Sequence, residues 1–182
     1  MSGRLPRVTA VLADLGLGPD LSRVAPDVLE VARERGAAVH RAVEALTYGY
    51  YDEADVHPDA APYVAAYQKF VAESGFQPIA AEIEVTHPVW RFRGHPDVIG
   101  WLNGRRGVID VKTGVSDGAA YQVAAYCDAW SAERPQEPVL WGAILHLHDD
   151  RGYRLEDVSL PAALPVWRAA LIVYTARKEL GR

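Results

Sequence analysis

Hydrophobic and polar residues alternate in the middle of the chain, along residues 79–86, 89–99 and 106–113. Alternation with a period of two predicts strands that bury one face and turn the other toward a polar environment. The predicted apolar face consists of Ile83, Val85, Trp90, Phe92, Val98, Ile109 and Val111. The predicted polar face consists of Glu82, Glu84, Arg91, Arg93, His95, Asp97, Asp110 and Lys112. Ile99 and Val108 break the alternation and Pro96 has no amide proton, so we expect a bulge or a sheet edge near residues 94–96.

The Asn-Gly dipeptide at 103–104 predicts a hairpin between the last two of these strands. Both residues tolerate the positive φ angles of a two-residue turn, which makes this pair the strongest short hairpin signal. In such a turn Leu102 pairs with Arg105, and the same register places Asp97 opposite Asp110. Opposed residues share a face, with Cβ atoms roughly 4.5–5.5 Å apart. Two carboxylates are therefore expected side by side.

Helical periodicity flanks the strand region on both sides. Residues 27–46 follow Pro26 and carry an apolar stripe at helical spacing, made of Val28, Val31, Val39, Val43 and Leu46. Further helices are predicted at residues 8–17, 60–74, 117–133 and 165–180, and further strands at 139–148 and 153–160. This order predicts an α/β fold with a mixed central β-sheet, in which an antiparallel meander and further strands are flanked by α-helices. We expect one domain over residues 1–182, with a mainly helical part at 1–75 and the sheet core with its closing helices at 76–182.

Composition narrows the function classes. A chain of 182 residues with 49% hydrophobic residues is long enough for a sizeable core. No apolar run approaches the roughly 20 residues of a membrane span, and the N-terminal segment does not read as a secretion signal. The single cysteine, Cys127, excludes an internal disulfide and any four-cysteine metal site. The net charge of −5 argues against a general basic coat for nucleic acid, and a cytoplasmic protein is the expectation.

The predicted polar face has the chemistry of a cation site. Asp97 and Asp110 repel each other unless a cation neutralises them, and carboxylate oxygens suit Mg²⁺ or Mn²⁺. Such an ion assists phosphoryl chemistry. Lys112 lies two residues beyond Asp110 on the same face, where its charge can stabilise phosphate oxygens. The alternative is a surface ion pair between an aspartate and Lys112 on a hairpin.

Five motifs, taken in chain order, resemble the PD-(D/E)xK nuclease superfamily. They are PRVTAVL at residues 6–12, RGAAVH at 35–40, GHPD at 94–97, DVKTG at 110–114 and QVAAY at 122–126. The second and the last are similar to helices of the RecB-like branch, and the first resembles the opening of phage recombination exonucleases. The resemblance implies a restriction-endonuclease-like core.

The same resemblance implies the roles of individual residues. His40, Asp97, Asp110 and the carbonyl of Val111 are expected to hold one or two Mg²⁺ or Mn²⁺ ions, and Lys112 is expected to be catalytic. The family also has a glutamate on its first strand, for which Glu82 is preferred and Glu84 is the alternative. Glu82 and Gln122 then complete the catalytic set with Asp97, Asp110 and Lys112. The expected substrate contacts are Arg91, Arg93 and Tyr126.

The expected activity is a metal-dependent deoxyribonuclease, preferably an exonuclease in DNA recombination, repair or phage DNA processing. One alternative is a site- or structure-specific endonuclease of the same fold. A second is a non-catalytic module for DNA binding or assembly, and a third is an unrelated acidic metal-binding protein. DNA is the expected partner, and no association with a membrane is expected. Further candidate partners are a single-strand annealing protein, another recombination or replication factor and a second copy of the chain. The expected setting is a bacterial cell or a phage-infected host.

Overall fold

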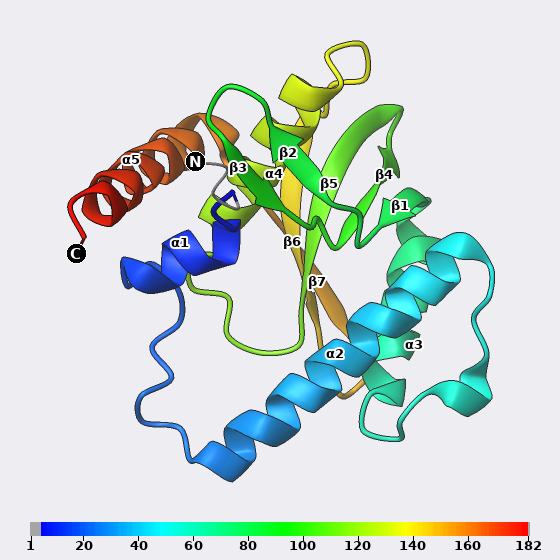
Figure 1. Cartoon of the computed structure of the whole chain (residues 1–182). Helices are drawn as coiled ribbons and strands as arrows, with labels where there is room; N and C mark the ends of the chain where they lie inside the picture. Colours follow the sequence, from blue (N-terminus) through cyan, green and yellow to red (C-terminus); the bar gives the residue numbers. More distant parts are fainter. Residues whose placement is uncertain (1–4, 182) are drawn as a thin grey trace.

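A five-stranded sheet lies between two layers of helices in the computed structural model, which describes residues 5–181 (Figure 1). The strands are β1 (Gln77–Ala81), β4 (Val98–Leu102), β5 (Arg105–Lys112), β6 (Trp141–Leu147) and β7 (Tyr153–Asp157), in the spatial order β1-β4-β5-β6-β7. Only the β5–β6 pair is parallel, so the sheet is mixed, as the sequence predicted. Residues 1–4 and 182, which the single-domain expectation also covered, lie outside the described residues.

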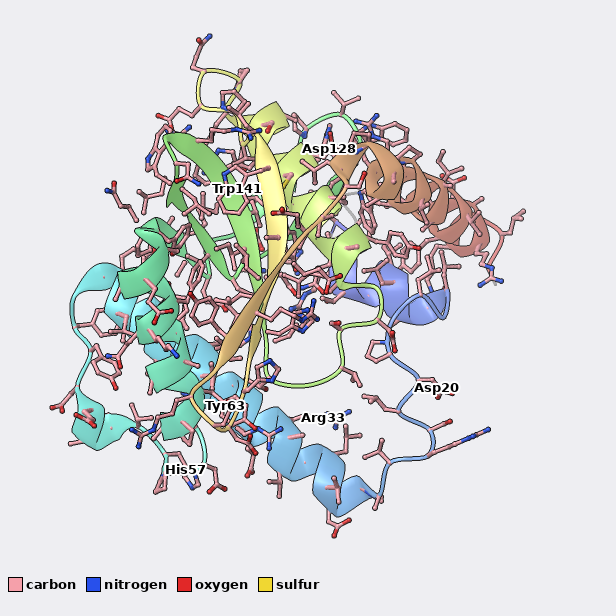
Figure 2. The ribbon with its side chains drawn as sticks, turned by 180° about the vertical axis from the view of Figure 1, so that it is seen from behind. Asp20, Arg33, His57, Tyr63, Asp128 and Trp141 are labelled. Carbon is pink, nitrogen blue, oxygen red and sulfur yellow. The ribbon has the colours of Figure 1, made fainter. Side chains whose placement is uncertain are left out.

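Each face of this sheet is covered by its own set of helices. One face packs against α1 (Val8–Asp14), α4 (Ala119–Glu133) and α5 (Leu160–Glu179). The other packs against α2 (Pro26–Tyr48) and α3 (Ala61–Ser74), and a short 3₁₀ helix, η1 (Glu53–Asp55), lies between these two. A separate two-stranded sheet, β2 (Val85–His87) with β3 (Phe92–Gly94), joins the first layer. The side chains that fill both layers are drawn in Figure 2.

The hairpin register predicted from the Asn-Gly dipeptide is confirmed. Leu102 pairs with Arg105, and the ladder runs without a shift to the pair of Val98 and Ile109. Asn103 and Gly104 have φ angles of 52° and 71°, as a two-residue turn with two left-handed residues requires. Asp97 directly precedes β4, so it stands at the mouth of the hairpin beside Asp110.

The two preceding strands were predicted as continuous, and this is wrong. The stretches 79–86 and 89–99 each divide, so that β1 and β4 belong to the large sheet while β2 and β3 form the small one. The division occurs at Glu82, whose φ of 52° turns the chain out of the strand conformation. Its amide donates to the carbonyls of Pro96 and Asp97, at 3.1 and 3.2 Å, which ties the two breaks together. The interruption predicted near residues 94–96 is therefore present as a break between β3 and β4.

The prediction that one whole face of the sheet meets a polar environment is also wrong. Ile99 and Val108, which broke the alternation, are fully buried against the layer of α1, α4 and α5. Val98 and Ile109 are fully buried on the opposite face against α2 and α3. Because both faces carry a core, the polar residues gather only at one end of the strands.

The longest helix, α2, follows its predicted apolar stripe only in its second half. Val39 and Val43 are buried, whereas Val28 and Val31 are 57% and 51% exposed. The first turns of α2 extend past the sheet in Figure 1, so they have no core to cover. The helix ends at Tyr48, and Gly49 follows with a φ of 79°, a left-handed helix cap.

Candidate active site

The polar residues of the hairpin lie where β1 ends, β4 begins and β5 ends, between α2 and α4. A pocket of about 230 Å³ opens at this point. Its lining residues are Arg7, Val8, Thr9, His40, Glu82, Gly94, His95, Asp97, Lys112, Gln122 and Tyr126. Segments from both helical layers and from the ends of the strands therefore build one site.

Three side chains at this pocket form a compact cluster of metal-binding type. Nδ1 of His40 lies 2.9 Å from Oε1 of Glu82 and 3.5 Å from Oδ1 of Asp97. One ligand atom from each of the three residues falls within 4.8 Å of the other two. His40 lies in the second half of α2, Glu82 directly follows β1 and Asp97 directly precedes β4. A single cation can reach all three at once.

The backbone turn at Glu82 separates two neighbouring glutamates. Glu82 faces His40, while Glu84 forms an ion pair with Arg93 and lies 3.7 Å from Nε2 of His95. The sequence left both glutamates open with a preference for Glu82, and the structure brings Glu82 into the cluster.

Asp97 and Asp110 are both buried, but they are held in different ways. Asp97 is 5% exposed, and its Oδ2 accepts a 2.7 Å hydrogen bond from the amide of Val111. Asp110 is fully buried, and Nζ of Lys112 lies 2.7 Å from its Oδ2. Within the described part of the chain, neither oxygen of Asp110 has a partner in hydrogen-bond geometry. Asp110 is therefore a buried carboxylate that lacks full compensation.

The pKa values of the site follow from this crowding of charge. The Asp97 carboxylate, supported by the Glu82 hydrogen bond, raises the pKa of His40 to about 9 although burial opposes the shift. Burial and then repulsion from Asp97 raise the pKa of Asp110 to about 7. For Lys112, burial disfavours the charged form, but Asp110 and Asp97 outweigh it and raise the pKa above its usual value. Lys112 thus carries a positive charge at neutral pH.

A family model identifies the superfamily of the chain. The model of the PD-(D/E)XK nuclease superfamily matches residues 11–162, which is most of the chain. This protein belongs to the PD-(D/E)XK nuclease superfamily. A search of curated proteins finds no match.

Solved structures give a wider comparison. An alkaline exonuclease, LHK-Exo from Laribacter hongkongensis, is 16% identical, with a TM-score of 0.40 over 98% of this chain and 95% of that one. The same enzyme in complex with dAMP gives a TM-score of 0.36 at 16% identity, over 97% of this chain and 93% of that one. A protein named SSO0001 is 12% identical, with a TM-score of 0.40 over 95% of this chain and 78% of that one.

The cluster of His40, Glu82 and Asp97 fits a divalent cation. Its donors are one imidazole nitrogen and carboxylate oxygens, which suit Mn²⁺ and Mg²⁺. The proton that the raised pKa holds on His40 lies between two carboxylates, so positive charge already occupies the place where a cation would bind. Asp110 lies beside this cluster and is compensated only in part, by Lys112, which provides a further reason for a cation. His40, Glu82 and Asp97 would hold it, with Asp110 next to them.

The QVAAY motif of the nuclease lies on α4 and lines the pocket through its first and last residues. Nε2 of Gln122 donates a 3.1 Å hydrogen bond to the hydroxyl of Tyr126. Burial raises the pKa of this hydroxyl well above its usual value, so Tyr126 keeps a proton to donate. Gly94 makes room for the ring, because a Cβ at this position would lie 2.2 Å from Cε1 of Tyr126.

Two residues expected to contact substrate do not line this pocket. Arg91 is exposed in the turn between β2 and β3, with a φ of 57°. Arg93 is held by Glu84 and by the carbonyl of Leu5, so its guanidinium serves the packing of the N-terminal segment. Neither arginine is among the residues that line the pocket.

Three lining residues carried no assigned role in the sequence prediction. Arg7 and Thr9 lie in the PRVTAVL segment, and His95 precedes the break before β4. The resemblance of that first segment to phage exonucleases was the available signal for Arg7 and Thr9. For His95 the signal was its place in the GHPD motif and on the predicted polar face.

Proposed function

We propose that this protein is a divalent-metal-dependent DNA nuclease that acts as an exonuclease. The observation that carries the proposal is the convergence of His40, Glu82 and Asp97 with the Lys112–Asp110 pair, in a chain of a nuclease superfamily. The preference for end-directed cleavage is supported by the motif resemblance to phage recombination exonucleases. A role in recombination, repair or phage DNA processing belongs to the same proposal.

The chemistry divides between the cation and the residues of the chain. When bound, Mg²⁺ or Mn²⁺ supplies charge for the scissile phosphate and lowers the pKa of an attacking water. Lys112, which is positively charged and fixed by Asp110, stabilises the negative charge that grows on the phosphate oxygens. Gln122 and Tyr126 donate hydrogen bonds that orient the substrate from the α4 side. The products would be 5′-phosphate and 3′-hydroxyl ends.

The deciding experiment compares end-labelled linear single- and double-stranded DNA with a covalently closed circle, in Mg²⁺ or Mn²⁺. We expect the linear substrates to be degraded and the circle to remain intact. Lys112→Ala should lower the rate about a hundredfold or more, as loss of a charge-stabilising donor does. Lys69→Ala is the matched control, because Lys69 is exposed on α3 and lies outside the pocket.

Each part of the proposal has its own contrary result. Cleavage of the closed circle would identify an endonuclease instead. Full activity of Lys112→Ala would remove the catalytic assignment. Calorimetric titration with Mn²⁺ separates a nuclease from a non-catalytic module, since absent binding, or binding that Asp110→Asn leaves unchanged, would favour the module.

A further inference from the structure

A groove of about 560 Å³ runs along the outward side of α2, next to the catalytic pocket. His40 and Glu82 line both the groove and the pocket. The other walls of the groove are Arg33, Gly36, Ala37, Arg41 and Glu44. The groove therefore adjoins the cation cluster and follows a single helix.

Two arginines, a histidine, a glutamate and a tyrosine share this side of α2. Their spacing of seven, one, three and four residues keeps them on one side of a helix. In chain order they are Arg33, His40, Arg41, Glu44 and Tyr48. The fifteen steps from Arg33 to Tyr48 span about 22 Å at the rise of an α-helix. Arg41 is exposed and has no ion-pair partner among the described residues, and the exposed Arg33 has only Glu30, at 3.8 Å. Both guanidinium groups are available to an anionic ligand.

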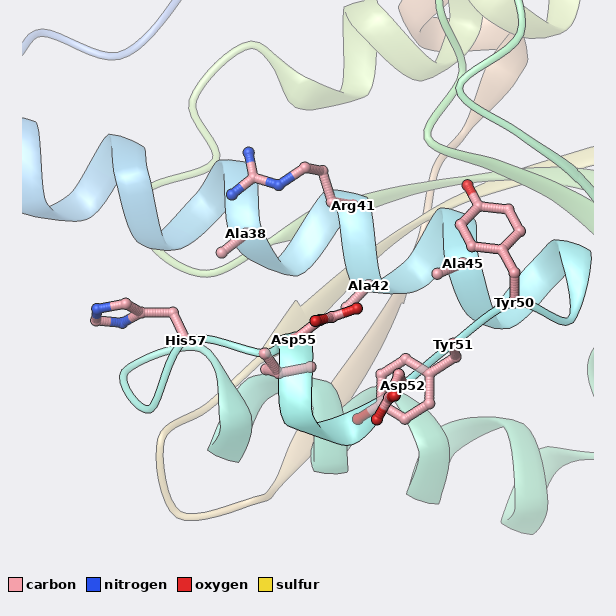
Figure 3. Close-up of a pocket in the computed structure, with 10 residues that line it drawn as sticks. Ala38, Arg41, Ala42, Ala45, Tyr50, Tyr51, Asp52, Asp55 and His57 are labelled. Atoms are coloured by element: carbon pink, nitrogen blue, oxygen red, sulfur yellow. The ribbon is translucent and has the colours of Figure 1, made fainter.

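An exposed aromatic pair lies at the C-terminal end of α2, beyond the residues that line the groove. The rings of Tyr48 and Tyr50 are nearly parallel, at 6°, with centroids 6.5 Å apart, and the two residues are 47% and 62% exposed. Arg41 and Tyr50 also line a pocket beside α2 together with Asp52 and Asp55, so acidic groups lie near them (Figure 3). This arrangement places cationic and aromatic groups along one surface.

The ring of Tyr48 is fixed close to the cation cluster. Its hydroxyl donates to the carbonyl of Ala81 at 3.0 Å and accepts from the amide of the same residue at 3.2 Å. The next residue in the chain is Glu82, one of the cluster residues. Two hydrogen bonds to one backbone unit hold the ring in place, so a partner that stacks there does not have to order it first.

We propose that this surface, called the α2 face and consisting of Arg33, Arg41, Tyr48 and Tyr50, binds single-stranded DNA next to the cleavage site. The inference rests on the proposed function, because it takes DNA as the substrate. Guanidinium groups pair with phosphates, and exposed aromatic rings stack on bases whatever their sequence. Only an unpaired base offers a free face for stacking, so the α2 face selects a single strand over a duplex. Glu44 opposes the phosphates and limits the affinity.

Binding is measured by fluorescence anisotropy of a labelled dT12 oligonucleotide, with Ca²⁺ in place of Mg²⁺. The double variant Arg33→Ala/Arg41→Ala should bind at least fivefold more weakly. It should also lower the slope of log Kd against log salt by about 1.4, at about 0.7 per phosphate contact on a single strand. Arg177→Ala is the control, because Arg177 is exposed on α5, on the side of the molecule away from α2 (Figure 1). Equal affinity of the double variant and this control would overturn the proposal.

Two further variants separate stacking from charge. Tyr50→Leu should weaken dT12 binding about fivefold, at the lower end of base–aromatic stacking, while Tyr50→Phe should keep the wild-type affinity. An abasic oligonucleotide of equal length should not distinguish Tyr50→Leu from wild type. Glu44→Gln should strengthen binding by removing repulsion. A Tyr50→Leu effect of the same size on abasic DNA, or tighter binding of a 12-base-pair duplex than of dT12, would contradict the proposal.

The two proposals fail in different experiments. Wild-type protein that binds dT12 through the α2 face but degrades no DNA overturns the nuclease and leaves the binding surface. Wild-type protein that degrades DNA, with α2 variants that bind dT12 normally, leaves the nuclease and overturns the binding surface.

Discussion

Glu82 and Glu84 are two residues apart, but their side chains have different partners. The reason is that the backbone leaves the strand conformation at Glu82. Glu82, with its φ of 52°, meets His40, and Glu84 meets Arg93. The pair therefore provides an internal control for cation binding.

We predict that Glu82→Gln weakens Mn²⁺ binding at least tenfold, because it removes one charged ligand from the cluster. Glu84→Gln should leave Mn²⁺ affinity within about twofold of wild type, since its carboxylate neutralises an arginine instead. Isothermal titration calorimetry of both variants checks this. The reverse order of effects would mean that Glu84 serves the cation.

Cation affinity should increase with pH across the neutral range. His40, with a pKa of about 9, and Asp110, with a pKa of about 7, bind protons that a cation must displace. Each proton lost above its pKa removes competition, so affinity rises from pH 6 to pH 9 and levels off above it. Mn²⁺ titrations at pH 6.5, 7.5 and 8.5 measure the slope, and His40→Gln should flatten its upper part. Affinity that falls with rising pH would contradict the assigned protonation states.

At the scale of elements, local signals were sufficient for the hairpin and insufficient for its neighbours. The turn at 103–104 fixes its own register within a few residues, so the placement of Asp97 beside Asp110 could be predicted. The division of the preceding strands depends on the amide of Glu82, which bonds to carbonyls about 15 residues away in the chain. Alternation in the sequence does not reveal such a bond, because a broken strand and a continuous one share the same period.

Helix α2 shows the same limit. Its stripe of valines predicted burial along the whole length, but burial depends on where the sheet ends, and Val28 lies beyond it. A glycine inside a helix, such as Gly36, can permit a close approach of backbone or ligand. The nearest atom to a Cβ at this position is Oγ1 of Thr113 at 3.8 Å, an ordinary contact.

We therefore predict that Gly36→Ala stabilises the protein by about 0.5–1 kcal/mol, the usual gain from replacing a glycine inside a helix. Guanidinium unfolding followed by circular dichroism measures the difference. Gly118→Ala is the contrasting variant, since Gly118 has a φ of 78° and a Cβ there would lie 2.0 Å from the carbonyl oxygen of Leu17. Destabilisation by Gly36→Ala would show that the helix needs the space.

At the scale of the whole molecule, a buried polar network joins the small sheet to the helices behind it. Nδ1 of His87 accepts hydrogen bonds from the amides of Val89 and Trp90, at 3.2 and 3.1 Å. Its Nε2 lies 3.5 Å from Asp128 on α4, whose carboxylate is bound by Arg168 of α5 through two nitrogens (Figure 2 labels Asp128). His87 must stay neutral for Nδ1 to accept these bonds.

Acidification should weaken the fold through this histidine. Burial, with a contribution from Arg168, lowers the pKa of His87 below its ordinary value of about 6.5 despite Asp128. Below about pH 6.5 His87 binds a proton in the unfolded chain more readily than in the native state. The free energy of unfolding that is present at pH 7.5 therefore declines as the pH falls. Unfolding free energies at pH 7.5 and 5.5, measured in EDTA, should decrease more for wild type than for His87→Gln. Equal decreases would exclude His87 as a source.

The site as a whole was predictable to the extent that its residues are close in sequence or carried by a motif. Asp97, Asp110 and Lys112 follow from one hairpin, whereas His40 required the resemblance to a family. Arg91 was assigned to the polar face by alternation, but the turn after β2 removes it from the strand.

No helix in the part of the chain that the structure describes has the length and apolar character needed to cross a bilayer.

The hydroxyl of Tyr48 has a consequence for how the molecule associates. Strand β1 lies at one edge of the five-stranded sheet, and its last residue, Ala81, has both its amide and its carbonyl engaged by that hydroxyl. Unpaired edge groups are templates on which a foreign strand can extend a sheet. Next to the cation cluster this template is closed by a side chain that no extended peptide can displace without breaking two hydrogen bonds. The edge of β1 is thus closed at Ala81, the residue that directly precedes the cluster residue Glu82.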